Sequence, residues 1–237
     1  MFIAALQTAR MGSLGVPGKN TLPVRGEPLF THNLRAALAT PEITEVYCST
    51  DDPAIAQWAR RHGVFPIDRP AELCGPDASH HDTILHGLAH IEGEIGELDA
   101  LVILLGNAAG ATPEDLSTAI RMLEADPRAD SIESVSPFPM FNPFRALCRS
   151  EDGTLQTILP QQWIAQRSRG LTNDRNDAGE VLFFNGSFWV VRRAALVRRD
   201  GLLPFPWLGR RILAYVQSPR MELDAPWQNT MLREPWE

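Results

Sequence analysis

Apolar and polar positions follow two different periods along the first half of the chain. Residues 2–8 and 99–105 are short, continuous apolar runs with the length and composition of buried strands. The segments 29–38 and 82–91 instead place apolar residues three or four positions apart, as amphipathic helices do. Strand and helix patterns alternate in this way up to residue 125. The alternation predicts an α/β domain with parallel strands joined by right-handed crossovers.

Two of the predicted helices have clear start signals. Asp52 precedes Pro53, directly after the predicted strand 45–50. Thr112 precedes Pro113 and two acidic residues. An N-cap side chain that accepts a hydrogen bond, followed by proline in the first turn, is typical of a helix N-terminus. We therefore expect helices to begin at both places, and capping explains Asp52 without a chemical role.

The second half of the chain has a different pattern. Short strand-like runs lie close together there, and the segment 160–180 between them is polar, rich in arginine and weakly periodic. That segment is open to three interpretations: a lobe, a loop or an arm that contacts a partner. We predict one domain over residues 1–237 with a lobe at about 138–180. The predicted strands are 130–138, 144–149, 154–159, 181–191 and 211–216, and a helix is expected at 226–232.

Composition narrows the classes of protein. The formal net charge of −7 argues against nucleic-acid binding as the main role, and no run of 18 apolar residues is present to span a membrane. The first residues lack the basic segment of a signal peptide. Cys48, Cys74 and Cys148 are widely separated, so we expect small buried side chains in a reducing cytoplasm.

Lys19 is the only lysine among 237 residues, while the other 21 basic side chains are arginine. It lies in a glycine-rich segment, residues 10–20, directly after the first predicted strand. Backbone N–H groups of such a loop can converge on an anion, and lysine binds phosphate as a compact point charge. The spacing fits neither the Walker A nor the dinucleotide fingerprint. The loop is interpreted as a phosphate cradle, and a plain glycine-rich connection is the alternative.

Glu222 and Asp224 follow the last predicted strand. Alternate residues of an extended segment point to the same side, so both carboxylates can face one cleft and hold a hard cation. Helix capping and surface charge are the alternative. Helix capping is likewise an equal alternative for Ser79 and Asp82, which lie before a predicted helix. His80 and His81 are adjacent, and a surface position is favoured for them over a metal site.

The order of these segments resembles the cytidylyltransferases that make CMP-sialic acid and related CMP-sugar acids. The resemblance spans nearly the whole chain and is most specific in the first loop and at Arg69–Leu73. The matching segments are Ala9–Ser13, Pro17–Asn20, Ser49–Asp52, Arg69–Leu73, Ala78–Ser79, Phe184–Trp189 and Glu222–Asp224. It implies a Rossmann-like nucleotidyltransferase fold with a mostly parallel sheet, helices on both faces and a small dimerising insertion. It therefore also implies a homodimer.

Roles follow from the resemblance position by position. Arg10 and Lys19 contact the phosphates of CTP, with Gly12, Ser13 and Asn20 in the same nucleotide-holding loop. Arg69 and Ser79 lie near the cytidine. Glu222 and Asp224 bind Mg²⁺. Arg167 and Arg169 fall in the lobe, near where the family has an arginine pair that faces the acidic acceptor.

Two departures from the family pattern stand out, the first bearing on rate or phosphate binding and the second on the acceptor. Leu14 stands where the family usually has a basic residue, and residues 105–110 replace the family's Leu-Gln-Pro-Thr-Ser-Pro stretch with a shorter, glycine-rich one. Three functions therefore stay open: a cytidylyltransferase acting on a nonulosonic sugar acid, one that makes a CMP-phosphonate, and a nucleotide-binding module with impaired catalysis. The sugar acid is favoured.

Overall fold

The computed structural model describes residues 1–13, 15–138, 141–167 and 180–233. Within this part of the chain, seven strands form one sheet in the order β11-β7-β10-β6-β1-β4-β5. Their bounds are β1 (Ile3–Thr8), β4 (Glu45–Thr50), β5 (Phe65–Asp68), β6 (Ala100–Leu105), β7 (Ser131–Pro137), β10 (Leu182–Arg192) and β11 (Ile212–Val216). Two short hairpins are separate from it: β2 (Pro23–Val24) with β3 (Glu27–Pro28), and β8 (Leu147–Arg149) with β9 (Leu155–Thr157).

The sheet is parallel except at one strand. Strand β1 pairs in parallel with β4 and β6, β4 with β5, and β7 with β11, whereas β10 is antiparallel to both β6 and β7. This arrangement confirms the predicted α/β class with a mostly parallel sheet. Every residue of β1 is buried, as expected for a strand covered on both faces.

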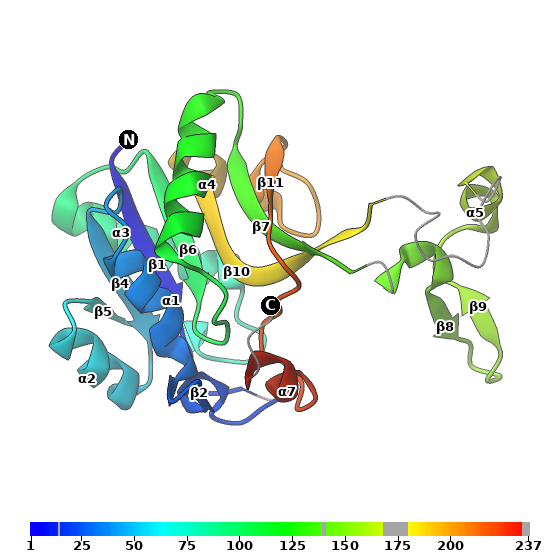
Figure 1. The fold of residues 1–237 in the computed structure, drawn as a ribbon, viewed down its shortest axis with the longest axis horizontal. Helices are drawn as coiled ribbons and strands as arrows, with labels where there is room; N and C mark the ends of the chain where they lie inside the picture. Colours follow the sequence, from blue (N-terminus) through cyan, green and yellow to red (C-terminus); the bar gives the residue numbers. More distant parts are fainter. Residues whose placement is uncertain (14, 139–140, 168–179, 234–237) are drawn as a thin grey trace.

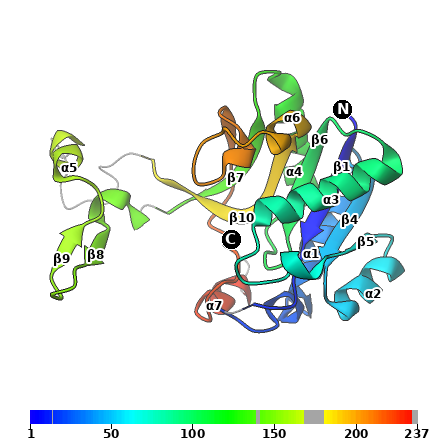
Figure 2. The same cartoon turned by 180° about the vertical axis from the view of Figure 1, so that it is seen from behind.

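Helices cover both faces of the sheet (Figures 1 and 2). Helices α1 (Leu29–Leu38), α2 (Pro53–Arg61) and α4 (Pro113–Ala125) supply apolar side chains to one core. Helices α3 (His80–Ile95) and α6 (Arg193–Val197) supply them to the core on the other face. The predicted helices at 29–38 and 82–91 are thus confirmed, and the second is longer than its apolar period indicated.

The two predicted helix starts are also confirmed. Asp52 Oδ1 accepts a hydrogen bond from the Ala54 N–H at 2.8 Å at the start of α2. Thr112 forms a reciprocal capping box with Asp115 at the start of α4. None of the described helices is long and apolar enough to cross a membrane.

A small lobe projects away from the sheet in Figure 1. The chain leaves the sheet after β7 and returns at β10; between them lie β8, β9 and helix α5 (Gln161–Arg167), and residues 168–179 lie outside the described part. Four large apolar side chains on this lobe are more than half exposed: Leu147, Leu155, Ile158 and Trp163. Cys148 is exposed here as well, so the prediction of a buried cysteine is wrong at this position, because β8 has no core beneath it.

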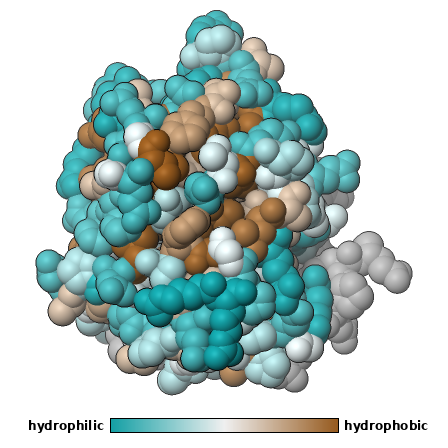
Figure 3. All heavy atoms as spheres, turned by 90° about the vertical axis from the view of Figure 1, so that its left-hand side faces the viewer, coloured by the Kyte–Doolittle hydropathy of each residue, from teal (hydrophilic) through white to brown (hydrophobic). Residues whose placement is uncertain are grey.

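The opposite end of the molecule presents the β5 edge of the sheet. Figure 3 shows apolar residues gathered in the middle of this face and hydrophilic residues around them. Phe65, on the edge strand β5, is 47% exposed. The helix predicted near the carboxyl end is α7 (Gln228–Arg233), which lies near β2 and the glycine-rich loop.

Candidate active site

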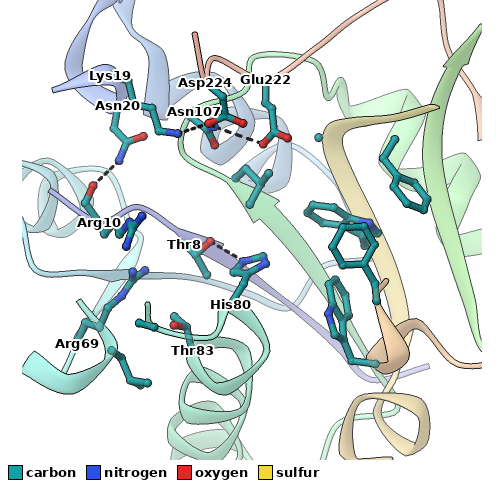
Figure 4. A pocket seen from close by; sticks show the side chains of 18 residues that line it. Thr8, Arg10, Lys19, Asn20, Arg69, His80, Thr83, Asn107, Glu222 and Asp224 are labelled. Carbon is teal, nitrogen blue, oxygen red and sulfur yellow. Dashed lines mark hydrogen bonds and ion pairs between the residues drawn. The ribbon is translucent and has the colours of Figure 1, made fainter. Parts of the chain in front are cut away.

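A cavity of about 310 Å³ opens at the carboxyl edge of the parallel strands. Thr8 and Leu105 end β1 and β6 there, and the loops that follow these strands extend over it. In open α/β sheets this edge is where ligands bind, because the loops leave the sheet in opposite directions. Figure 4 shows basic side chains on one side of the cavity and aromatic rings on the other.

The glycine-rich loop forms the basic side. It does not enter a helix directly but passes through a 3₁₀ turn, Lys19–Thr21, and then the β2–β3 hairpin. The buried Asn20 side chain donates to the Arg10 carbonyl oxygen at 2.8 Å, which ties the two ends of the loop together. Gly15 packs so closely on the Asp224 backbone that it leaves no room for a Cβ atom. The loop is therefore held against the segment that carries the two late carboxylates.

Lys19 and the late carboxylates meet inside the cavity (Figure 4). Lys19 Nζ lies 2.5 Å from Asp224 Oδ1. Asn107 Nδ2 donates to Glu222 Oε2 at 3.3 Å and to Asp224 Oδ1 at 3.2 Å. Burial, followed by the charge of Asp224, raises the pKa of Glu222. The site thus brings together two carboxylates that repel each other. Lys19 and Asn107 balance their negative charge only in part.

Asn107 is a further candidate functional residue. From the sequence alone it stood out only as a member of segment 105–110, which differs from the family pattern. It lies just after β6, and its amide holds both carboxylates as well as the Leu223 carbonyl oxygen. The altered segment 105–110 therefore organises the acidic pair. No local pattern could have indicated this, because 115 residues separate Asn107 from Glu222.

Arg10 and Arg69 continue the basic side. Arg10 Nη1 donates to the Gly75 carbonyl oxygen at 2.5 Å, and Arg69 donates to Ser49 Oγ at 3.2 Å and to the Ser49 carbonyl oxygen at 2.7 Å. Burial lowers the pKa of Arg69, but a guanidinium stays charged in proteins. Both arginines are fixed by backbone carbonyls and keep donors free for an anionic or polar ligand.

His80 lies at the floor of the cavity, between its two sides. Its Nε2 lies 3.1 Å from Thr8 Oγ1, and burial, with a smaller effect of the nearby Arg69, lowers its pKa to about 4. His81 is buried and its Nε2 lies 2.8 Å from the Leu196 carbonyl oxygen. The predicted surface position of both histidines is wrong, because α3 begins at residue 80 and its first turn packs on the sheet.

Four aromatic rings line the other side of the cavity: Phe184, Trp189, Phe205 and Trp207. The centroid distances are 5.1 Å from Phe184 to Phe205, 5.9 Å from Phe205 to Trp207 and 5.7 Å from Trp207 to Trp189. Two of these residues belong to β10 and two to the segment after α6. The sequence did not indicate that these four rings lie together, because their clustering depends on how β10 lies beside the segment after α6.

The structure gathers six of the predicted site residues around the cavity: Arg10, Lys19, Asn20, Arg69, Glu222 and Asp224. Gly12, Ser13 and Ser79 are not among the residues that line it. Ser79 instead caps α3, where its Oγ accepts from the Asp82 N–H at 3.2 Å. Arg167 ends α5 in the lobe. Leu14 and Arg169 lie outside the described residues.

The carboxylate pair suits a hard divalent cation. Mg²⁺ prefers oxygen ligands and is commonly held by one or two carboxylates together with substrate phosphates and water. Glu222 and Asp224 supply such oxygens beside the loop that carries Lys19 and Arg10. No group of three or more acidic, histidine or cysteine residues that could hold a metal occurs in the described part of the chain. The donor set therefore fits a cation that the substrate helps to bind.

A mostly parallel sheet with a basic loop and an acidic pair across one cavity defines the class of α/β nucleotide-binding proteins. Comparisons with known proteins point to one family within that class. Residues 4–74 match the model of the cytidylyltransferase family. The CMP-N,N'-diacetyllegionaminic acid synthase of Legionella pneumophila is 29% identical over 227 residues, covering 95% of this chain and 92% of that protein.

Two further similarities agree with that match. The N-acylneuraminate cytidylyltransferase of Oncorhynchus mykiss is 28% identical over 95% of this chain but only 48% of its own length. The solved structure of a CMP:2-keto-3-deoxy-manno-octonic acid synthetase complexed with CTP has a TM-score of 0.68 and 18% identity, covering 98% of this chain and 97% of that one. The chain is thus similar over nearly its whole length to cytidylyltransferases, and its first third matches the family model.

Proposed function

We propose that this protein is a CTP-dependent cytidylyltransferase that joins CMP to an acidic acceptor of the nonulosonic sugar acid class. The observation that carries the proposal is the meeting of Lys19, Glu222 and Asp224 in one cavity, in a chain similar to this family. The similarity to enzymes named for CMP-linked sugar acids supports the choice of acceptor.

The reaction is an in-line displacement at phosphorus. An oxygen of the acceptor forms a bond to the α-phosphorus of CTP, and the bond from that phosphorus to the β-bridging oxygen breaks. Pyrophosphate leaves with the electron pair, and the proton of the acceptor hydroxyl passes to water. Such a transfer depends on positioning and charge neutralisation more than on covalent help from the protein.

The basic side of the cavity provides that neutralisation. Lys19 and Arg10 bind the triphosphate and stabilise the charge that develops on the transferred group and on pyrophosphate. Arg69 lines the same cavity and is near enough to His80 to affect its pKa, which suits a role at the cytidine. Gly12, Ser13 and Asn20 shape the phosphate loop, and Ser79 acts at the cytidine through the first turn of α3.

Glu222 and Asp224 are the proposed holders of Mg²⁺. A Mg²⁺ ion held by these two carboxylates would offset the negative charge of the phosphates. Lys19 Nζ, 2.5 Å from Asp224 Oδ1, adds a positive charge at the same place.

The lobe is proposed as the dimerisation and acceptor element. Its exposed Leu147, Leu155 and Trp163 are apolar surface that a second copy of the chain would cover. The resemblance makes Arg167 and Arg169 the candidates for binding the acidic acceptor. A cytoplasmic location fits the three free cysteines, since a reducing compartment keeps thiols unpaired. Sedimentation of the full chain measures the oligomeric state.

Pyrophosphate release tests the activity directly. The protein is incubated with Mg²⁺, each of the four nucleoside triphosphates and a panel of nonulosonic acids and phosphonates. Release that requires CTP and a sugar acid supports the proposal, while release with phosphonates alone assigns the second acceptor class. CTP binding that ignores Mg²⁺, with no release from any acceptor, identifies an impaired binding module.

A further inference from the structure

A carboxyl group that the proposed mechanism does not use is buried beside the cavity. Glu133, on β7, is 1% exposed, and neither of its carboxyl oxygens has a hydrogen-bond partner among the described residues. The Trp189 indole Nε1 is also buried and makes no well-aligned hydrogen bond, although the indole is near enough to Glu133 to affect the pKa of its carboxyl group. An unpaired acid in a protein interior is costly, and such a group normally has a ligand, ion or water to complete it.

The register of the sheet places Glu133 behind the aromatic side of the cavity. Glu133 pairs with Trp189 across β7 and β10, and Trp189 lines the cavity. Two positions earlier on the same face of β7, Ser131 Oγ donates to the Leu208 carbonyl oxygen at 2.7 Å. This face of β7 therefore lies under the segment that carries Phe205 and Trp207.

The charge of Glu133 depends on what lies beside it. Burial, opposed in part by the indole of Trp189, raises the pKa of Glu133, and the charge of Glu222 raises it further, so the carboxyl is held neutral until a cation beside it favours the charged form. The basic side chains that line the cavity, Arg10, Lys19 and Arg69, lie on its other side (Figure 4). Among the described lining residues, the aromatic end thus has acidic neighbours and no lysine or arginine.

Four aromatic rings are the second observation that points to a cation. The faces of tryptophan, and more weakly of phenylalanine, attract ammonium groups. Trp189, Trp207, Phe205 and Phe184 surround one end of a cavity that is backed by an unpaired carboxyl group. An apolar ligand group would use the rings but would leave the Glu133 carboxyl without a polar partner.

We propose that the acceptor carries a protonated amine, which lies against the rings of Trp189 and Trp207 with Glu133 behind them as its counter-charge. The inference rests on the proposed transferase activity and narrows its substrate to acids that also carry an ammonium group, which occupies the aromatic end. Glu133 is a specificity-determining residue here and takes no part in the chemical step.

Matched acceptors test this inference. Each pair differs in one group: 2-aminoethylphosphonate against 2-hydroxyethylphosphonate, and a nonulosonic acid with a free amine against its N-acetyl form. The ratio of kcat/KM within each pair is measured by pyrophosphate release at saturating CTP. We expect the amine to be favoured by about tenfold or more in the class that reacts, which corresponds to about 1.4 kcal/mol.

Three variants separate charge from packing. Glu133→Gln keeps the shape and is expected to reduce the amine preference to about threefold or less, with the KM for CTP unchanged. Trp207→Leu removes one ring and is expected to reduce it as well. Glu124→Gln is the control, because Glu124 is 41% exposed and pairs only with the amino terminus. Preference for the neutral member in both pairs, or an unchanged preference in Glu133→Gln, overturns the inference.

The two proposals fail in different ways. If the wild-type protein releases no pyrophosphate with any acceptor, the transferase proposal fails. Calorimetric titration of the same pairs into the protein with CMP then decides the inference. Tighter binding of the amine that is lost in Glu133→Gln supports it, and equal or absent binding of the amine overturns it. If Glu133→Gln does not fold, the acceptor ratios of the wild type and Trp207→Leu give the same decision.

Discussion

The basic end of the cavity is built mainly from one loop, whereas the aromatic end is built from two segments far apart in the chain. Arg10, Lys19 and Asn20 lie within eleven residues of one another and are fixed by backbone carbonyls or by the acidic pair. Trp189 and Trp207 come from β10 and the segment after α6. The proposed triphosphate site is thus formed largely by one local segment, while the proposed acceptor end depends on the packing of distant strands.

The largest expected effect comes from removing the ammonium at the basic end. Lys19→Ala is expected to lower kcat/KM by about 10²–10³, because one preorganised electrostatic contact to the developing charge is lost. Arg128→Ala is the matched control, since that side chain is 81% exposed and remote from the cavity. Steady-state pyrophosphate release measures both. Near-normal turnover of Lys19→Ala at limiting CTP would remove the lysine from the mechanism.

Loss of the acidic pair is expected to be nearly as severe. Asp224→Asn or chelation of Mg²⁺ should reduce turnover by about a hundredfold, because the phosphate charge is no longer offset. Calorimetry adds a second readout: CTP affinity should depend on Mg²⁺ in the wild type and not in Asp224→Asn. A variant whose CTP affinity still responds to the metal would place the cation elsewhere.

His80 joins the two ends, and its burial makes stability depend on pH. Its pKa is lowered to about 4, below the unfolded value near 6.5, so on acidification the unfolded chain takes up a proton that the folded one does not. Stability attributable to His80 is intact above pH 6.5 and falls as the pH drops toward 4, by about 2 kcal/mol at pH 5. Urea unfolding of the wild type and His80→Asn at pH 7 and 5 measures the difference. An equal loss in both would contradict it.

The smallest effect concerns the contact between β10 and the acidic pair. Gly186 has φ +72°, and a Cβ atom there would lie 2.9 Å from Glu222 Cβ. Gly186→Ala should therefore displace Glu222 and lower kcat by about tenfold, besides the cost of about 1–2 kcal/mol of a left-handed alanine. Gly153→Ala has the same backbone cost at φ +87° with no atom within 4 Å of the new Cβ. Equal activity of the two variants would mean that Glu222 tolerates the shift.

Local sequence signals were sufficient for most of the architecture. Apolar periodicity predicted the strand–helix alternation up to α4, and the caps at Asp52 and Thr112 located two helix starts. These features depend on neighbours within a few residues, so the chain itself specifies them. The glycine-rich loop and the Glu222–Asp224 spacing likewise indicated two sides of one cavity, and the structure brings them together.

By itself, the sequence determined the α/β class, the phosphate-type loop and the candidate residues on the basic side. Only the tertiary structure decided that His80 faces the cavity and Ser79 caps a helix, that Asn107 holds both late acids, and that Glu133 lies behind Trp189. The reason is physical. Pairing of β10 between β6 and β7 brings together residues more than 50 positions apart, and such contacts follow from strand order, which has no local signature.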